Sequence, residues 1–391
     1  MTRSSRTRKL IGTLLVSLTP HWCAAIAQTG PTIVSVVPAD ALESAKIVNG
    51  TMTFWYPTVG ELVSKTDRCT ATLIGCRTVL TAAHCVTGDS NIRDYKVYFP
   101  HGGLFSLAGT IAYQRTTYQA PDYNSSSADV AVLKLAKAVE GIAPEPINDD
   151  REHASGIAGT IVGYGVTGGD NGDYGLKRFG SVVAATCPAA VQNKDLLCWN
   201  FWDKRTSDTC NGDSGGPLFL SEGRTHRLVS GVTSGGNATC QPPDRAFDAS
   251  VFRNSTWIKS TAGTDLGSAV CGAVTPLEDL ETRYRGFSGQ LNDASPSRAF
   301  EIEISGTHQL RIGVNLGKPI GVTADHMISQ PKIYVIKGKS TAVSQDLCST
   351  NVKLPTAFCT VDSPPNGTYT VVLTRGDAAK TADFQLTISA F

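Results

Sequence analysis

Residues 211–217 read Asn-Gly-Asp-Ser-Gly-Gly-Pro, so that one serine stands between an aspartate and two glycines. Glycine accepts backbone conformations that other residues resist, and the run therefore favours a tight turn. Such a turn can aim several backbone N–H groups into one small space, where they would stabilise an oxyanion beside the Ser214 hydroxyl. A serine hydroxyl is a weak nucleophile alone, so this interpretation requires a base and an acid elsewhere. Without them, the run is a glycine-rich surface loop.

Three further stretches of sequence favour the catalytic interpretation over a surface loop. Residues 80–85 read Leu-Thr-Ala-Ala-His-Cys, and residues 128–135 read Ala-Asp-Val-Ala-Val-Leu-Lys-Leu, an alternating strand-like segment that an aspartate opens. Residues 46–50 read Lys-Ile-Val-Asn-Gly. With these motifs the chain resembles the trypsin/chymotrypsin family of serine endopeptidases over about residues 47–260. The order His, Asp, Ser matches that family and differs from the order in subtilisins and α/β-hydrolases.

The resemblance implies a role for each member of a catalytic triad. His84 would take the proton of Ser214 and later give it to the leaving amine, while Asp129 would hold the imidazole tautomer. The backbone N–H groups of Gly212 and Ser214 would form the oxyanion hole. A single histidine or aspartate is more often structural than catalytic, so the combination of the three motifs carries this interpretation.

The resemblance also implies a specificity. Asp208, six residues before the nucleophile, would lie at the base of the primary pocket, where a carboxylate suits arginine or lysine. Ser234 and Gly236 resemble the strand that lines this pocket, and Gly235 replaces the family's usual tryptophan. The expected partners are therefore protein or peptide substrates with Arg or Lys. If Arg245 pointed inward, it would neutralise Asp208 and remove this preference, and that alternative stays open.

A further implication is activation by cleavage. In the family, a propeptide is cut away at the position that corresponds to the bond between Lys46 and Ile47. The freed amine of Ile47 would then pair with Asp213, because a buried carboxylate needs a partner. In the alternative interpretation, Ile47 and Val48 merely begin the first strand.

The N-terminus has the pattern of an export signal. Residues 1–27 carry four basic residues and no acidic one, an apolar run at 10–18 and the small-x-small sequence Ala-Ile-Ala at 25–27. This predicts a signal peptide cut after Ala27, a propeptide at 28–46 and a secreted protein, extracellular or periplasmic. The apolar run is too short to span a bilayer, so no membrane span is expected. A net charge of +1 gives no reason to expect a nucleic-acid partner.

The cysteines of the exported chain are even in number. Eleven are present, and one, Cys23, would leave with the signal, which predicts a set of disulfides. The family resemblance implies three pairs: Cys69–Cys85, Cys187–Cys198 and Cys210–Cys240. Among the remaining four, Cys348 and Cys359 are close in sequence and flank a turn, which makes them the natural fourth pair.

Cys76 and Cys271 then remain, and we expect them to join and to anchor the following linker to the first barrel. Free thiols or an intermolecular bond are the alternative. The histidines are not grouped with cysteines in zinc-ligand spacing, so no metal is expected, and nothing in the sequence asks for a cofactor.

The expected fold class is all-β. Strand-like runs separated by turn signals occur at 70–74, 79–82, 95–99, 104–112 and 130–135. With the resemblance, residues 47–260 predict two six-stranded antiparallel barrels with the site in the cleft between them, closed by a helix at 251–260. Residues 261–283 are a linker candidate. Residues 284–391 alternate again and predict a β-sandwich, which resembles accessory domains of secreted bacterial peptidases; its partner is unknown.

Three hypotheses for function follow. The first is a secreted, zymogen-activated serine endopeptidase that cuts after Arg or Lys. The second is a catalytically silent relative that binds a partner, although such relatives usually lack a triad member. The third is another serine hydrolase, such as an esterase, which would show a different triad order.

Overall fold

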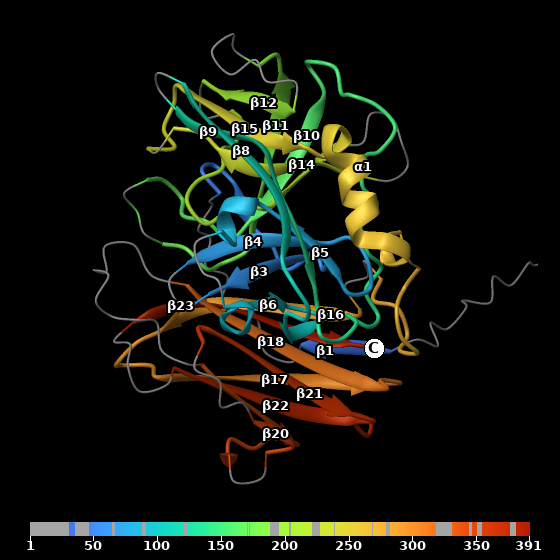
Figure 1. Cartoon of the computed structure of the whole chain (residues 1–391). Helices are drawn as coiled ribbons and strands as arrows, with labels where there is room; N and C mark the ends of the chain where they lie inside the picture. Colours follow the sequence, from blue (N-terminus) through green and yellow to red (C-terminus); the bar gives the residue numbers. More distant parts are fainter. Residues whose placement is uncertain are drawn as a thin grey trace, which may run out of the picture. The chain divides into compact units, whose positions relative to one another are not determined.

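The structure is a computed structural model. It describes residues 31–35 and 47–391, apart from 65–66, 88–90, 121–122, 170, 172, 188–194, 203–204, 221–226, 238, 268, 279–281, 318–330, 344–345, 350–353 and 376–380. The expected signal peptide and Lys46 lie outside these residues. Within the described part, strands dominate and Val251–Ala262 (α1) is the one α-helix, which confirms the all-β fold class (Figure 1).

The first barrel is a sheet with the strand order β7-β6-β3-β4-β5-β9-β8. Its two ends meet, because the Ala108 N–H donates to the Lys134 carbonyl (2.8 Å) and the Ala136 N–H to the Ser106 carbonyl (2.9 Å). β7 and β8 are consecutive in the chain, so together they act as one interrupted strand of a six-stranded barrel. The strands are β3 (Val59–Val63), β4 (Arg68–Leu73), β5 (Thr78–Thr81), β6 (Lys96–Phe99), β7 (Gly103–Ser106), β8 (Ala112–Ala120) and β9 (Tyr123–Lys134).

The second barrel closes directly. Its strands follow the order β10-β13-β14-β15-β12-β11, and β11 pairs back onto β10, while a short strand β2 is added to β11. These strands are β2 (Thr51–Met52), β10 (Ala158–Gly163), β11 (Arg178–Ala185), β12 (Leu196–Phe201), β13 (Pro217–Leu220), β14 (Leu228–Gly235) and β15 (Asp244–Ser250).

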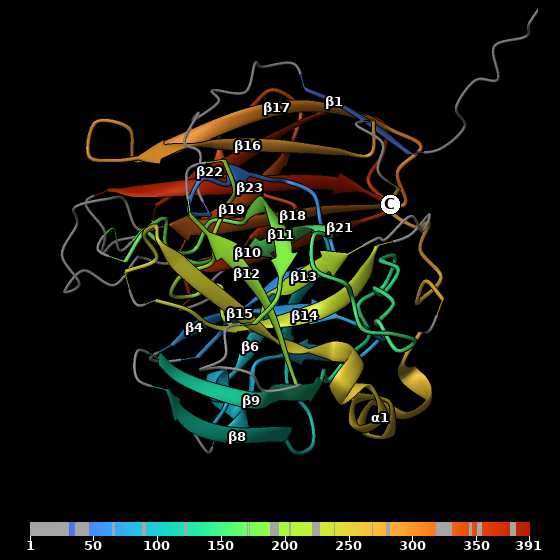
Figure 2. The same cartoon turned by 90° about the horizontal axis from the view of Figure 1, so that it is seen from above.

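One apolar core joins the two barrels. Leu80 and Val130 of the first barrel belong to the same buried cluster as Val162 and Val232 of the second. Helix α1 begins at Val251, immediately after Ser250, whose hydroxyl accepts the Arg253 N–H at 3.3 Å, an N-cap bond. The helix lies against β9 and β14 (Figure 2). The motifs predicted from the sequence are thus carried by a continuous packed scaffold.

Residues 284–391 form a sandwich of two sheets, as expected. One sheet has the order β16-β23-β18-β21 and the other β1-β17-β22-β19-β20, in which β1 is the N-terminal segment Thr32–Ser35. Their inner faces share one core, to which Ile312 and Leu386 contribute from the first sheet and Ile302 and Val371 from the second. The strands are β16 (Tyr284–Leu291), β17 (Ser297–Ser305), β18 (Gln309–Gly317), β19 (Lys332–Lys337), β20 (Cys348–Ser349), β21 (Thr356–Asp362), β22 (Gly367–Thr374) and β23 (Ala382–Ala390).

The strand β1 was not expected in this sheet. It spans Thr32–Ser35, in the segment that the sequence predicts as a propeptide, and it pairs antiparallel with β17. The sandwich therefore includes chain from both ends of the sequence.

Buried polar contacts join the sandwich to the first barrel. The His101 ring bonds the Ser389 hydroxyl through Nδ1 and the Phe54 carbonyl through Nε2, both at 2.7 Å. The Asn315 amide donates to the Glu61 carboxylate at 2.8 Å. Burial raises the pKa of Glu61 to about 7 against the opposing effects of Arg68 and Asn315. Because unpaired buried polar groups are costly, these bonds hold the two parts in one arrangement.

The ten cysteines that the structure describes form five disulfides, with the pairing expected from the sequence. The pairs are Cys69–Cys85, Cys76–Cys271, Cys187–Cys198, Cys210–Cys240 and Cys348–Cys359.

Candidate active site

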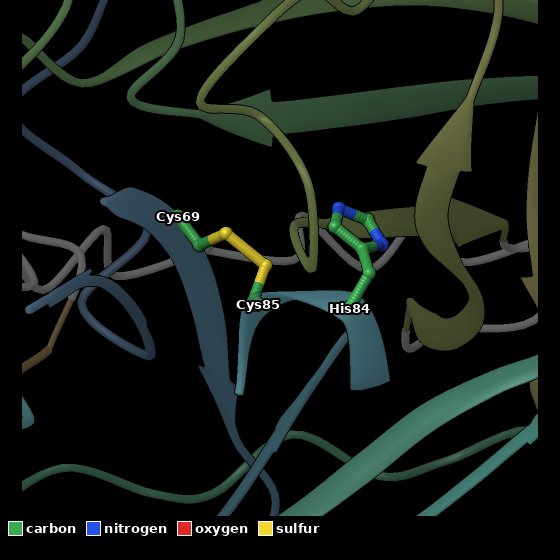
Figure 3. A group of neighbouring side chains, drawn as sticks. All are labelled: Cys69, His84 and Cys85. Carbon is green, nitrogen blue, oxygen red and sulfur yellow. A yellow bond between two sulfur atoms is a disulfide. The ribbon is translucent and has the colours of Figure 1, made fainter. Parts of the chain in front are cut away.

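The three expected catalytic residues come from both barrels. His84 lies on a short 3-10 helix, Ala83–Cys85, directly after β5, and Asp129 lies in β9. Ser214 lies in the turn before β13 of the second barrel. The Cys69–Cys85 disulfide ties the helix of His84 to β4, as Figure 3 shows.

His84 and Asp129 are joined by two hydrogen bonds. The ring Nδ1 lies 2.6 Å from Asp129 Oδ2, and the His84 backbone N–H donates to Oδ1 at 2.9 Å. The Ser234 hydroxyl donates to Oδ2 at 2.7 Å. Burial raises the pKa of Asp129, but the bonds and charge of His84, with the bond from Ser234, outweigh this and bring it below 3.8. An ionised Asp129 keeps the proton on Nδ1 and leaves Nε2 available as a base.

The hydrogen bond from Ser234 to Asp129 is a contact that the sequence did not predict. The sequence places Ser234 in the pocket-lining strand, whereas its side chain is directed at Asp129. Arg115 is a second unpredicted neighbour, with its Nε 3.9 Å from Asp129 Oδ1. Neither residue belongs to one of the three catalytic motifs: Arg115 lies on β8, which pairs with β9, whereas Ser234 lies on β14 of the other barrel.

The turn around Ser214 requires its glycines. Gly212 and Gly215 have φ values of +96° and +82°, in the region that favours glycine. A Cβ on Gly215 would lie 2.1 Å from the Thr81 hydroxyl and 2.4 Å from the Thr70 carbonyl, so no larger residue fits. The Ser214 carbonyl accepts the Thr70 N–H at 2.8 Å. The first barrel thus fixes the turn that the second barrel carries.

Two N–H groups in this turn are available to a ligand. Asp213, Gly215 and Gly216 use theirs in backbone hydrogen bonds, whereas those of Gly212 and Ser214 find no acceptor in the described part of the chain. Ser214 and His84 are brought close, since Cys85 Sγ lies 3.7 Å from the Ser214 carbonyl oxygen. The described contacts include no hydrogen bond between the Ser214 hydroxyl and His84; catalytic bonds are often long until substrate binds.

The residues expected at the primary pocket include a second acid. Asp208 is fully buried, and its carboxylate accepts the Thr209 N–H at 2.9 Å. Burial raises the pKa of Asp208 well above its ordinary value, and the neighbouring Asp244 carboxyl raises it further. Asp244 accepts the Asn237 N–H at 2.9 Å, and its Oδ2 would lie 3.6 Å from a Cβ on Gly236. The Asp244 carboxyl therefore opposes ionisation of Asp208.

Arg245 does not neutralise this pair. Its guanidinium lies over the Trp202 ring, 5.4 Å from the ring centroid, and its side chain is exposed while those of Asp244 and Ala246 are buried. The alternation of β15 therefore turns Asp244 inward and Arg245 outward. Strand alternation places Asp244 and Arg245 on opposite faces, but by itself it does not say which of the two faces inward.

Ile47 and Asp213 are both buried but are not paired. Ile47 belongs to an apolar cluster of the second barrel that includes Trp199. The Asp213 carboxylate accepts the N–H groups of Gly165 (2.8 Å) and Cys210 (2.9 Å), and no ion pair reaches it from a described residue. Burial raises the pKa of Asp213 to about 6, opposed by these N–H groups and by the charge of Arg178.

One group of side chains has the composition of a metal site. Ligand atoms of Cys69, His84 and Cys85 lie within 4.8 Å of one another (Figure 3). The two sulfur atoms are joined in a disulfide, so they are not thiolate ligands, and His84 Nδ1 is bonded to Asp129. These residues do not fit a metal ion.

Two antiparallel barrels that bring a His–Asp pair to a glycine-bounded serine define the class of chymotrypsin-fold serine endopeptidases. The Trypsin family model matches residues 49–258, more than half of the sequence. The chain therefore belongs to the trypsin family.

None of the helices in the described part is long and apolar enough to cross a membrane.

Curated relatives agree with this assignment. The chain is 32% identical over 192 residues to a trypsin of Saccharopolyspora erythraea, an alignment that covers 44% of this chain and 78% of the relative. It is 30% identical over 218 residues to fibrinolytic enzyme isozyme C of Lumbricus rubellus, covering 49% of this chain and 86% of the relative. Alkaline trypsin C of Manduca sexta is 26% identical over 273 residues, covering 61% and 98% respectively.

Proposed function

We propose that the chain is the precursor of a secreted endopeptidase that cuts after Arg or Lys and is activated by cleavage after Lys46. Residues 47–260 would be the protease, with residues 284–391 as its accessory sandwich. The main support for this specificity is the buried pair of Asp208 and Asp244, which lies in the expected primary pocket on the same barrel as Ser214. Five disulfides support an extracellular location, because such bonds persist in oxidising compartments.

The catalytic step follows from the geometry around His84. Nε2 would take the proton of the Ser214 hydroxyl as the oxygen attacks the substrate carbonyl carbon. Asp129, ionised and held by three donors, would stabilise the resulting imidazolium. The N–H groups of Gly212 and Ser214 would bind the oxyanion, a contribution of roughly 3–4 kcal/mol per donor in comparable enzymes. His84 would then protonate the leaving amine, and water would hydrolyse the acyl-enzyme.

The specificity rests on two carboxyl groups. Because burial and the neighbouring Asp244 carboxyl raise its pKa, Asp208 would keep a proton at pH values where an ordinary carboxyl is ionised. An arginine or lysine side chain in the pocket would favour release of that proton, because it supplies the positive charge that the pair lacks. Preference for cationic side chains should therefore grow as pH rises.

The activation step rests on Asp213. Its carboxylate is buried and held by backbone donors, and no described cation pairs with it. The new amine of Ile47 would supply this cation, and pairing would lower the pKa of Asp213 and fix the adjacent turn.

Cleavage-site profiling of the activated protein on a peptide mixture tests this proposal. We expect cuts after Arg and Lys, an N-terminus at Ile47, and loss of all activity in Ser214→Ala. An Asp208→Ser variant should remain active but move to apolar residues. Apolar preference in the wild type would refute the specificity. An active enzyme that starts well before Ile47 would refute the activation step, and absence of turnover would favour the silent binding protein.

A further inference from the structure

The segment before the expected cleavage site is a strand of the C-terminal sandwich. β1 (Thr32–Ser35) pairs antiparallel with β17 in a four-residue register that runs from Thr32 opposite Ser305 to Ser35 opposite Ile302. The Thr32 and Ser305 hydroxyl groups are 2.7 Å apart. On the other side of the strand, the Ile33 N–H donates to the Thr282 carbonyl at 2.7 Å. β1 is therefore the edge strand of its sheet, and one further hydrogen bond, to Thr282, holds its outer side.

Ile33 anchors this strand in the core of the sandwich. Its side chain is fully buried and belongs to the same apolar cluster as Ile302, Leu386 and Tyr369. Pro31, two residues before it, is also buried. Since full burial of an isoleucine side chain contributes about 1.5–3 kcal/mol, side-chain packing reinforces the backbone bonds. None of these contacts involves the bond between residues 46 and 47.

We propose that the sandwich is a receptor for the chain's own propeptide, and that residues 28–46 stay bound through β1 after activation. The mature protein would then be a non-covalent two-chain complex. This inference rests on the proposed cleavage after Lys46. Strand addition to a sheet edge is a general mode of peptide binding, with affinity from backbone bonds and specificity from alternate side chains.

The propeptide sequence is compatible with its staying intact and bound after cleavage. Residues 28–45 contain no lysine or arginine, so an enzyme that cuts after these residues leaves the segment whole. The segment also contains no cysteine, so β1 cannot be retained by a disulfide. Within the described residues 31–35, retention would come from the strand pairing and from the burial of Ile33 and Pro31.

The test uses the full-length Ser214→Ala precursor, which cannot digest itself. It is cut with a trace of trypsin, passed through native gel filtration, and then denatured for mass spectrometry and N-terminal sequencing. We expect Ile47 as the new N-terminus and the propeptide ending at Lys46 in near-equimolar amount. Hydrogen exchange should show the amides of β1 equally protected before and after the cut.

Two variants place the same charge on one strand. Ile33→Asp puts a carboxylate in the sandwich core and should weaken retention by roughly 100-fold or more. Thr32→Asp puts it on the less buried face and should retain the peptide far better. If Ile33→Asp fails to fold, the wild-type measurement still decides.

The outcomes separate the two proposals. An Ile47 terminus with loss of the peptide on gel filtration overturns this inference and leaves the activation proposal intact. Retention unchanged in Ile33→Asp also overturns it. A cut at another position overturns the proposed activation and this inference with it.

Discussion

Removing the Cys76–Cys271 disulfide should destabilise the protein without reducing its activity. The bond closes a loop with a sequence separation of 195. In the chain-entropy description, opening such a loop by replacing both cysteines with alanine costs about 5 kcal/mol at 25 °C. Cys187–Cys198 and Cys210–Cys240 lie inside the loop and shorten it, but the dependence is logarithmic, so they change the estimate by only about 0.2 kcal/mol.

Activity should persist because other bonds hold the linker. The Cys271 carbonyl accepts the Gly141 N–H at 2.9 Å, and the Leu277 N–H donates to the Gly141 carbonyl at 2.8 Å. The Asp265 carboxylate accepts from the Arg77 N–H and the Thr78 hydroxyl, at 2.9 and 2.6 Å. The native path of the linker therefore does not depend on the disulfide, and the effect should arise in the unfolded chain.

The assay is urea unfolding without reductant, followed by tryptophan fluorescence. The midpoint should fall, and the slope should rise because the opened chain exposes more surface. The matched control replaces Cys187 and Cys198, whose separation of 11 predicts a smaller loss of about 3 kcal/mol. A smaller loss for Cys76–Cys271 than for this control would refute the entropic reasoning. A fall in kcat/KM would show instead that the bond positions the linker.

Other variants test the site and the interface. Ser214→Ala should abolish turnover and keep the wild-type unfolding midpoint; residual turnover in a steady-state peptide assay would contradict the mechanism. Asp208→Ser should lower the kcat/KM ratio of arginyl to leucyl substrates by orders of magnitude. In the wild type this ratio should rise with pH as Asp208 ionises, by up to about tenfold per pH unit, and comparing two substrates cancels the titration of the general base. Asp244→Gly should move this rise to lower pH without abolishing it, because burial, the larger cause of the raised pKa of Asp208, remains. Burial, and next the charge of Lys177, lowers the pKa of His101 from 6.5 to about 3. Between these pH values the unfolded chain binds one more proton than the folded protein, so the free energy of unfolding should decrease as the pH is lowered from 6.5 to 3. His101→Gln should remove up to ~1.4 kcal/mol of this loss per pH unit, measured by urea unfolding; equal slopes for the two proteins would disprove it.

The sequence alone indicated the family, the candidate triad and the expected pairing of the cysteines. His84, Asp129 and Ser214 each lie in a short motif whose residue types the chemistry requires, and their order along the chain is itself diagnostic. The buried alternation of the strands was equally visible, because a side-chain period of two is a local property. Lys46 carries a prediction that lies outside the described residues.

Only the tertiary structure decided which side chains meet. Asp244 faces Asp208 and Arg245 faces solvent because a shift of one residue along a strand reverses its face, and no local pattern fixes that register. The pairing of Thr32–Ser35 with β17 joins segments some 270 residues apart through a four-residue strand. A strand of four residues carries too little sequence pattern to predict its partner. Its position depends on the burial of Ile33 in the core of the sandwich, and that core forms only in the folded protein.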